Sequence, residues 1–211
     1  MAKSFKTSAV QVFAFAAVVC LFFAFCVTSA NAADSSKTLA NLQAAYNGES
    51  NAKAKYLEYA KKADSEGFGQ AASLFRAAAR SEEVHIASYE KLIKALKGTP
   101  KADIKKVAVK STKENIKDAI KGEMTESVKI YPDFAKQAEA DKNDKAKMVF
   151  LGVAKVEGGH VDLYKDALAN LKKGPAKEYI VCTVCGYVTA DLTLKKCPVC
   201  SHPREDFVSV K

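Results

Sequence analysis

Residues 74–89 read LFRAAARSEEVHIASY, and this stretch decides the fold. Its apolar residues recur every three or four positions, which is typical of the buried stripe of an α-helix. Glu82 and His85 fall on that stripe one turn apart, whereas the neighbouring Glu83 is out of register. The pattern therefore predicts a helix that carries titratable side chains into a protein core.

The same pattern returns in residues 149–164, which read VFLGVAKVEGGHVDLY. The residues that return at an offset of +75 are Phe75, Ala79, Glu82, His85, Tyr89, Leu96 and Pro100, as Phe150, Ala154, Glu157, His160, Tyr164, Leu171 and Pro175. Those that return at +74 are Thr38, Asn41, Ala45, Gly48 and Glu49, as Thr112, Asn115, Ala119, Gly122 and Glu123. A duplicated helical hairpin predicts a pseudo-twofold bundle, in which a site on the axis draws equivalent residues from both halves.

Helical periodicity extends over the whole region from Thr38 to Lys173. Glycine, proline and polar clusters divide it, and the expected helices cover residues 37–66, 68–97, 112–140 and 144–173. The link from Gly98 to Ser111 is longer than the other two. Short, long and short links predict an all-α four-helix bundle with one long crossover.

Each expected helix places a glutamate at a core position near its middle. These are Glu49, Glu82, Glu123 and Glu157, and Glu126 follows Glu123 by one turn. A helical glutamate is usually a solvated surface residue, but five converging carboxylates would cost several kcal/mol per uncompensated ion. Two divalent cations would nearly neutralise them. Carboxylates joined by the imidazoles of His85 and His160 suit iron or manganese better than calcium or zinc.

The last part of the chain predicts a second metal site of a different kind. Cys182 and Cys185 form one Cys-x-x-Cys knuckle, and Cys197 and Cys200 form another. Such paired knuckles predict a tetrahedral thiolate site, and about 35 residues need a metal to hold a fold. Iron and zinc both fit this spacing. Two disulfides are a third option in an exported chain.

The first 32 residues have the organisation of an export signal. Lys3 and Lys6 precede an apolar run from Val12 to Val27, and small residues follow at Ala30 and Ala32. We expect cleavage after Ala32 and a periplasmic location, or a membrane anchor if the segment stays uncleaved. The expected organisation is thus a signal peptide at 1–32, the bundle at 33–174 and the ribbon at 177–211.

Composition sets outer limits on the function. The chain has 211 residues, a formal charge of +9 and 48% hydrophobic residues, which excludes a disordered protein and a multi-span transporter. The lysines are spread along expected helix exteriors, without aromatic interleaving or a nucleic-acid recognition motif. We therefore expect solvated faces and no nucleic-acid partner.

Taken together, the motifs resemble those of the rubrerythrin family over essentially the whole chain after Ala32. The motifs that carry the resemblance are Asn47-Gly48-Glu49-Ser50, Leu74-Phe75-Arg76, Glu82-x-x-His85, Gly122-Glu123-x-x-Glu126, Tyr131-Pro132, Glu157-x-x-His160 and the terminal Cys-x-x-Cys-Gly-Tyr/Cys-Pro-x-Cys ribbon. The resemblance implies a ferritin-like domain with two irons, followed by a rubredoxin-like domain with one iron on four cysteines. It further implies reduction of hydrogen peroxide to water in a homodimer or higher homo-oligomer, with electrons from a donor protein such as rubredoxin. If the chain is exported, as its first 32 residues predict, we expect the donor to be an extracytoplasmic carrier such as a cytochrome.

The resemblance also implies roles for individual residues. Glu82 and Glu157 would bridge the irons, and Glu49 and Glu123 would be terminal ligands. His160 would bind one iron, and the other would exchange His85 for Glu126 on a change of oxidation state. Tyr56 and Tyr131 would hydrogen-bond to the ligand carboxylates.

Two other functions remain open from the sequence. A ferroxidase or iron-handling protein would use the same carboxylates with oxygen as the oxidant. A zinc-ribbon interaction protein on a structural bundle would have no electron path at all.

Overall fold

The computed structural model describes Met1 and residues 28–211, and gives side chains from Lys37 onward. The apolar run expected for the export signal, Val12 to Val27, lies outside the described residues. Among the helices that are described, none has the length and apolar character of a membrane span.

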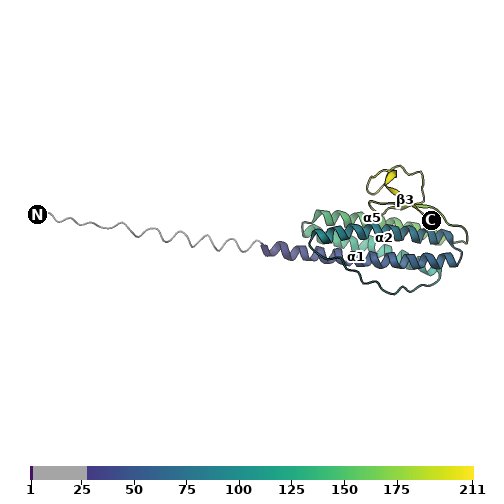
Figure 1. Cartoon of the computed structure of the whole chain (residues 1–211), viewed down its shortest axis with the longest axis horizontal. Coiled ribbons are helices and arrows are strands. Elements are labelled where there is room, and N and C mark those ends of the chain that lie inside the picture. Colours follow the sequence, from purple (N-terminus) through teal and green to yellow (C-terminus); the bar gives the residue numbers. More distant parts are fainter. Residues whose placement is uncertain (2–27) are drawn as a thin grey trace.

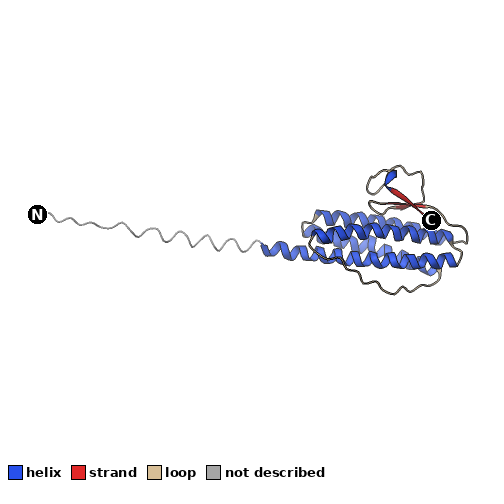
Figure 2. Ribbon diagram, viewed as in Figure 1, coloured by secondary structure: helices blue, strands red, loops and turns tan. Residues whose placement is uncertain are grey.

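Four helical rods form a bundle, as the sequence predicts (Figures 1 and 2). The first two are α1 (Thr28–Ser65) and α2 (Gly69–Ala95). The third consists of α3 (Thr112–Thr125), a π-helical turn η1 (Glu126–Ile130) and α4 (Tyr131–Ala140). The fourth is α5 (Asp144–Ala169). The rods differ from expectation at their ends, since α1 begins before residue 37 and α5 ends before residue 173.

Local side-chain caps fix where two of the helices begin. Ser111 and Glu114 form a capping box at the start of α3, in which each side chain bonds to the other residue's backbone N–H. The Asn143 side chain accepts a hydrogen bond from the backbone N–H of Ala146 at the start of α5, at 3.0 Å. The turn between α1 and α2 requires Gly67, whose φ is +81°.

Two equivalent clamps join the hairpins across the pseudo-twofold axis. The backbone N–H and hydroxyl of Thr38 both donate to Asp141 Oδ2, with an N···O distance of 3.0 Å. The backbone N–H and hydroxyl of Thr112 donate to Glu66 Oε2 in the same way, at 2.9 Å for the nitrogen. Each clamp holds the start of one hairpin to the end of a rod in the other hairpin. The bundle thus repeats its terminal contacts as well as its core.

The long crossover is held as an extended strap against the outer face of α1. The side chains of Gln43, Asn47 and Asn51, spaced by four residues, bond to the strap backbone at Thr99, Lys101, Asp103 and Lys105. Each amide can both donate and accept, so the three side chains satisfy the strap's backbone groups much as a neighbouring strand would. This ladder fixes the strap beside the middle of α1.

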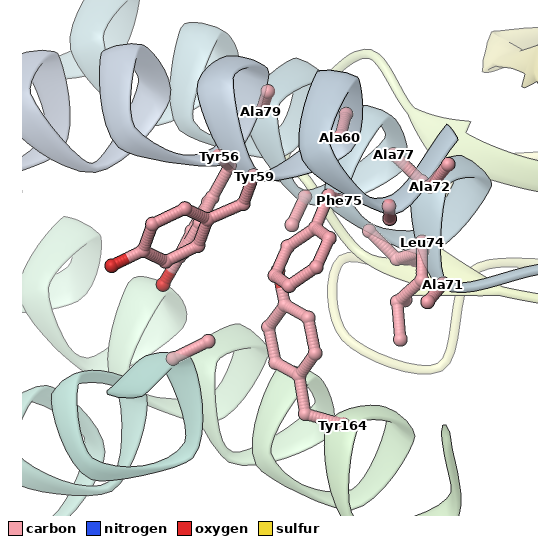
Figure 3. Packing of buried hydrophobic residues seen from close by; sticks show 14 of the residues in the cluster. Tyr56, Tyr59, Ala60, Ala71, Ala72, Leu74, Phe75, Ala77, Ala79 and Tyr164 are labelled. Atoms are coloured by element: carbon pink, nitrogen blue, oxygen red, sulfur yellow. The ribbon is translucent and has the colours of Figure 1, made fainter. Parts of the chain in front are cut away.

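Aromatic residues fill the core on both sides of its midpoint. One cluster contains Tyr56, Tyr59, Phe75 and Tyr164, with neighbouring ring centroids 5.3–6.4 Å apart (Figure 3). The other contains Tyr89, Tyr131, Phe134 and Phe150. The two clusters correspond under the sequence duplication, and they leave a polar layer between them.

The C-terminal segment forms a small three-stranded antiparallel sheet with the order β2-β1-β3. The strands are β1 (Tyr179–Cys182), β2 (Val188–Thr189) and β3 (Phe207–Val210), and a 3₁₀ turn, η2 (Arg204–Asp206), precedes β3. The ribbon lies against α2 and α5 (Figure 1). Its own core is minimal, as expected for a unit that depends on a metal.

Candidate metal centres

Six titratable side chains meet in the polar layer between the aromatic clusters. Glu49 comes from α1, Glu82 and His85 from α2, Glu123 from α3, and Glu157 and His160 from α5. All six are at most 1% exposed. Their ligand atoms form two groups, in each of which all atoms lie within 4.8 Å of one another. Because Glu82 and Glu157 belong to both groups, they are placed to bridge two ions.

The hydrogen bonding of these residues is incomplete without cations. Among the six residues, the buried atoms without a well-directed hydrogen bond are Glu49 Oε2, Glu82 Oε1, Glu123 Oε2, both carboxylate oxygens of Glu157 and both ring nitrogens of His160. Several of these atoms crowd together instead, with His160 Nδ1 2.8 Å from Glu157 Oε2. Buried polar atoms are normally paired, and unpaired carboxylates in a core are costly. Four carboxylates and two imidazoles are also the donor set that first-row transition metals accept. The residues present therefore fit a dinuclear metal centre.

The pKa values of the cluster show that its buried negative charges repel one another. Burial, together with repulsion from Glu157, raises the pKa of Glu49 well above its usual value and that of Glu123 to about 8. For His160, burial opposes the charged form, but Glu123 and Glu157 outweigh it and raise the pKa. Protons thus partly neutralise the cluster without metal. Divalent cations would displace them, since ligand atoms must be deprotonated to bind.

Two tyrosines orient the carboxylates of Glu123 and Glu49 across the pseudo-twofold axis. Tyr56 on α1 donates its hydroxyl hydrogen to Glu123 Oε1, and Tyr131 on α4 donates to Glu49 Oε1. Both phenols are buried, and burial raises the pKa of each well above its usual value, so they remain donors. Such partners fix the direction in which a ligand carboxylate presents its free oxygen.

Glu126 and His85, which the family resemblance implies are alternative ligands of one iron, lie at different positions. His85 Nδ1 is inside the cluster, 2.9 Å from Glu82 Oε2 and 3.0 Å from Glu157 Oε1. Glu126 belongs to neither ligand group. It begins η1 and lines a cavity of about 550 Å³ between α1, α3 and the strap. Glu126 thus faces a cavity at the edge of the centre.

The pair Gly158-Gly159 lies in the middle of α5, where glycine is unfavourable for a helix. A Cβ on Gly158 would lie 3.2 Å from Ser127 Oγ, a tight contact. Ser127 belongs to η1 and donates its hydroxyl hydrogen to the carbonyl of Ala154 at 2.8 Å. Gly158 therefore lets the π-helical turn approach α5 beside the ligands, whereas nothing lies within 4 Å of a Cβ on Gly159.

The four cysteines of the ribbon converge as a second candidate centre. The closest Sγ atoms pair one cysteine from each knuckle, Cys185 with Cys197 at 3.5 Å and Cys182 with Cys200 at 3.6 Å. All four are free thiols at these distances, which are far longer than a disulfide bond. Their arrangement suits one tetrahedral ion, and both iron and zinc accept it.

The ribbon touches the buried centre through the first knuckle. The carbonyl oxygen of Cys185 lies 3.2 Å from His85 Nε2, and Ser81 Oγ donates to the carbonyl of Gly186 at 2.6 Å. Gly186 has φ +85°, and a Cβ there would lie 2.5 Å from His85 Nε2. Only glycine permits this approach. The sequence indicates the knuckle but not the contacts of Ser81 and Gly186, because no local pattern marks which surface a small domain covers.

Comparisons with known proteins agree with both parts of this geometry. The family model described as rubrerythrin matches residues 40–168, and that of the rubrerythrin rubredoxin-like domain matches residues 181–208. The chain is 32% identical to nigerythrin of Nitratidesulfovibrio vulgaris, covering 82% of this chain and 86% of the relative. It is 34% identical to a rubrerythrin of Porphyromonas gingivalis, covering 83% and 91%.

Solved structures give the same result for the fold. Fully reduced, all-ferrous nigerythrin superposes with a TM-score of 0.77 at 31% identity, covering 82% of this chain and 86% of that one. A bacterioferritin of Desulfovibrio desulfuricans superposes with a TM-score of 0.63 at 19% identity, covering 66% and 82%, and shows the ferritin-like fold alone.

Proposed function

This chain belongs to the rubrerythrin family, and we propose that it is an oxidoreductase that reduces hydrogen peroxide to water at a di-iron centre. The observation that carries the proposal is the contact between Cys185 and His85, which joins a thiolate metal site to the buried carboxylate cluster. A structural zinc ribbon would have no need of this contact. A centre that must be supplied with electrons would use it.

Different residues of the cluster would coordinate the two ions. Glu82 and Glu157 would bind both, Glu49 and Glu123 would bind one each, and the two histidines would complete the set. Iron ions held there would together supply the two electrons that reduction of one O–O bond requires. The complete reaction also consumes two protons and releases two water molecules.

The chain's own groups keep this centre ordered and largely dry. Tyr56 and Tyr131 hold their phenolic hydrogens on Glu123 Oε1 and Glu49 Oε1, which leaves the second oxygen of each carboxylate for an ion. The aromatic clusters exclude water from both ends of the cluster. Glu126 faces the cavity, and we propose that it takes the place of His85 as a ligand on oxidation of the centre.

Electrons would enter through the ribbon. We propose iron in the Cys182, Cys185, Cys197 and Cys200 site, because four thiolates around one iron can exchange an electron with little rearrangement. The path runs from Cys185 through its carbonyl to the imidazole of His85. A rubredoxin or a cytochrome would be the donor protein.

We also propose export to the periplasm and assembly into a homodimer or higher oligomer. Export is supported by the order of basic, apolar and small residues in the first 32 positions. The clamp at Thr38, which corresponds to Thr112, the first residue of α3, lies beyond the expected cleavage point. Cleavage after Ala32 would thus remove nothing that the clamp uses. Assembly is supported by exposed apolar side chains on η1 and α5, namely Val128, Met148 and Leu151. A mature protein whose first residue is Ala33, recovered from the periplasm, would support export; an uncleaved chain in the membrane fraction would support an anchor.

The proposed activity is tested by reoxidation of the reduced protein. Iron and zinc are first quantified, and the anaerobically reduced protein is then mixed with hydrogen peroxide or with oxygen. We expect rapid reoxidation by peroxide and slow reoxidation by oxygen. The reverse order, with iron(II) consumed as a substrate, would favour a ferroxidase. Zinc in place of iron in the ribbon would remove the electron path and favour an interaction protein.

A further inference from the structure

Three polar residues on one side of the buried centre break the internal duplication. Lys55, Tyr59 and Asp118 correspond to Ile130, Phe134 and Ala44, which are all apolar. The nearby ligands and their tyrosines are kept, since Glu123 corresponds to Glu49 and Tyr56 to Tyr131. The three polar residues therefore form a separate unit that the symmetric centre does not need for holding metal.

These residues extend the hydrogen-bonded contacts of the centre outward. Tyr56 donates to Glu123, and its ring lies beside that of Tyr59, with centroids 6.4 Å apart (Figure 3). Tyr59 donates its hydroxyl hydrogen to Asp118 Oδ2 at 2.9 Å, and Lys55 Nζ lies 3.1 Å from the same oxygen. The line from the ligand Glu123 to Asp118 thus contains two adjacent phenols.

The other half of the bundle has the same ring spacing without the second phenol. The centroids of Tyr131 and Phe134 are 6.2 Å apart, close to the spacing of Tyr56 and Tyr59. Packing alone is therefore satisfied by phenylalanine at this position. The hydroxyl of Tyr59 and the carboxylate of Asp118 are additions made on one side.

The outer end of this line meets the cavity that Glu126 lines. Lys55, Tyr59 and Asp118 all contribute to its wall, and its volume of about 550 Å³ admits small molecules. Tyr59 itself is only 3% exposed. Its side chain is thus almost entirely covered by protein, while the residue lines a space that a small reductant can enter.

The protonation of the pair is suited to coupled loss of an electron and a proton. Burial and the hydrogen bond to Asp118 raise the pKa of Tyr59, so the phenol keeps its proton. Burial opposes ionisation of Asp118, but the charge and hydrogen bond of Lys55 and the hydrogen bond of Tyr59 outweigh it and lower the pKa. A proton acceptor therefore already lies within hydrogen-bond distance of a protonated phenol.

We propose that Tyr56 and Tyr59 carry oxidising equivalents away from the centre. This transfer protects the centre when it reacts with peroxide while the centre holds one reducing electron instead of two. This inference rests on the proposed function. An electron leaves Tyr59 for the centre by way of Tyr56, the O–H bond of Tyr59 breaks, and its proton forms an O–H bond on Asp118. A thiol that enters the cavity then returns a hydrogen atom to the Tyr59 radical. Asp118 releases its proton to water, and two thiyl radicals combine as a disulfide.

The test is a search for the radical in half-reduced, iron-loaded protein. The protein is mixed with hydrogen peroxide, frozen within milliseconds to seconds and examined by electron paramagnetic resonance, and peroxide consumption is measured in parallel. We expect a tyrosyl signal that narrows when tyrosine is ring-deuterated and that added thiol removes. The signal should be lost in Tyr59→Phe, which reproduces the residue of the other half, and should diminish in Asp118→Asn, which keeps the hydrogen bond but accepts no proton.

Tyr46→Phe is the matched control, because Tyr46 is also an α1 tyrosine but packs with the other cluster. The inference is overturned if peroxide is consumed without any tyrosyl signal, or if the signal persists in Tyr59→Phe. A Tyr59→Phe variant that keeps the radical signal but shows slower turnover and a changed solvent isotope effect would overturn the inference. That result would show that Tyr59 transfers protons instead of electrons. Repeating the experiment with oxygen separates the two proposals. A Tyr59 radical formed by oxygen alone, with peroxide inert, would refute the proposed function and overturn the protection against peroxide, although it would still show that Tyr59 gives up an electron to the centre.

Discussion

Replacing Gly186 by alanine should uncouple the ribbon from the buried centre while leaving both metal sites intact. A Cβ at this position would lie 2.5 Å from His85 Nε2 and 2.6 Å from Ser81 Oγ, which is closer than non-bonded atoms approach. His85 and Ser81 are both buried, so neither can move aside without disturbing the core. The knuckle must therefore move away from α2.

The size of the effect follows from the contacts that this movement breaks. They are the hydrogen bonds between Cys185 and His85 and between Ser81 and Gly186. At about 1 kcal/mol each, their loss lowers the equilibrium constant for docking about 30-fold. Ser81→Ala removes one bond without a clash, and should lower it about 5-fold. Alanine at φ +85° also strains the knuckle by about 1–2 kcal/mol, so metal content must be measured before rates are compared.

The assay is rapid mixing of the fully reduced, iron-loaded protein with hydrogen peroxide. The absorption of the di-iron centre reports the first step, which is oxidation of that centre by peroxide. The visible absorption of the oxidised ribbon iron reports the second step, in which an electron leaves the ribbon. We expect oxidation of the di-iron centre to keep its rate in Gly186→Ala, and reoxidation of the ribbon iron to slow by up to about 30-fold as docking weakens. A ribbon that carries iron in this variant and is reoxidised at the wild-type rate would refute the path through His85. Gly152→Ala, which introduces a Cβ with nothing within 4 Å, is the control.

Three further predictions concern the cavity, the clamps and the ribbon. Glu126→Ala should lower peroxide turnover at least about tenfold, about 1.4 kcal/mol in the barrier, with little change in the thermal unfolding midpoint; unchanged kinetics would count against a ligand role. Hydrogen bonds from the hydroxyl and backbone N–H of Thr112 lower the pKa of Glu66 to about 2, whereas the pKa in the unfolded chain is about 4.3. The ionised Glu66 carboxylate therefore stabilises the fold fully above about pH 4.3, and this stabilisation is lost as the pH falls toward 2. Glu66→Gln should therefore lower the free energy of unfolding by about 1 kcal/mol at pH 7. Urea unfolding should show a smaller difference between wild type and variant at pH 3 than at pH 7. An equal difference at both pH values would contradict this assignment. Chelation of the ribbon metal should unfold residues 177–211 and open them to proteolysis while the helical circular dichroism remains, and a ribbon that resists proteolysis without metal would refute this dependence.

The buried cluster could be predicted from the sequence because two independent regularities fix it. The spacing of three between Glu82 and His85 places both on one helical face, and the apolar stripe tells which face is buried. The duplication then brings Glu157 and His160 to the opposite side. Glu83, out of register, is accordingly half exposed and pairs with Lys53 and Arg80.

Contacts between elements without a repeating pattern could not be predicted in the same way. The docking of Gly186 on Ser81 depends on the orientation of the whole ribbon, which no local spacing encodes. The sequence shows the spacing of Gln43, Asn47 and Asn51 but not what these side chains bind. They bind the backbone of the strap, and backbone groups are the same whatever the side chains of the strap residues are. The helix ends differ from those that the sequence predicts, because a few weak bonds decide fraying and capping.

The asymmetry of the centre traces to one inserted residue. The offset between the halves is 74 at Glu49 and Glu123 but 75 at Tyr56 and Tyr131, so the third rod holds one additional residue between these positions. The π-helical turn η1 lies within that interval. A single turn with i→i+5 bonds absorbs an insertion locally, so Glu123 before it and Tyr131 after it both stay buried in the core. The insertion also places Glu126, whose counterpart at the offset of 74 is the apolar Ala52, at the wall of the cavity. One residue thus preserves the symmetric ligand set and adds a carboxylate on one side only, where Tyr59 and Asp118 also lie.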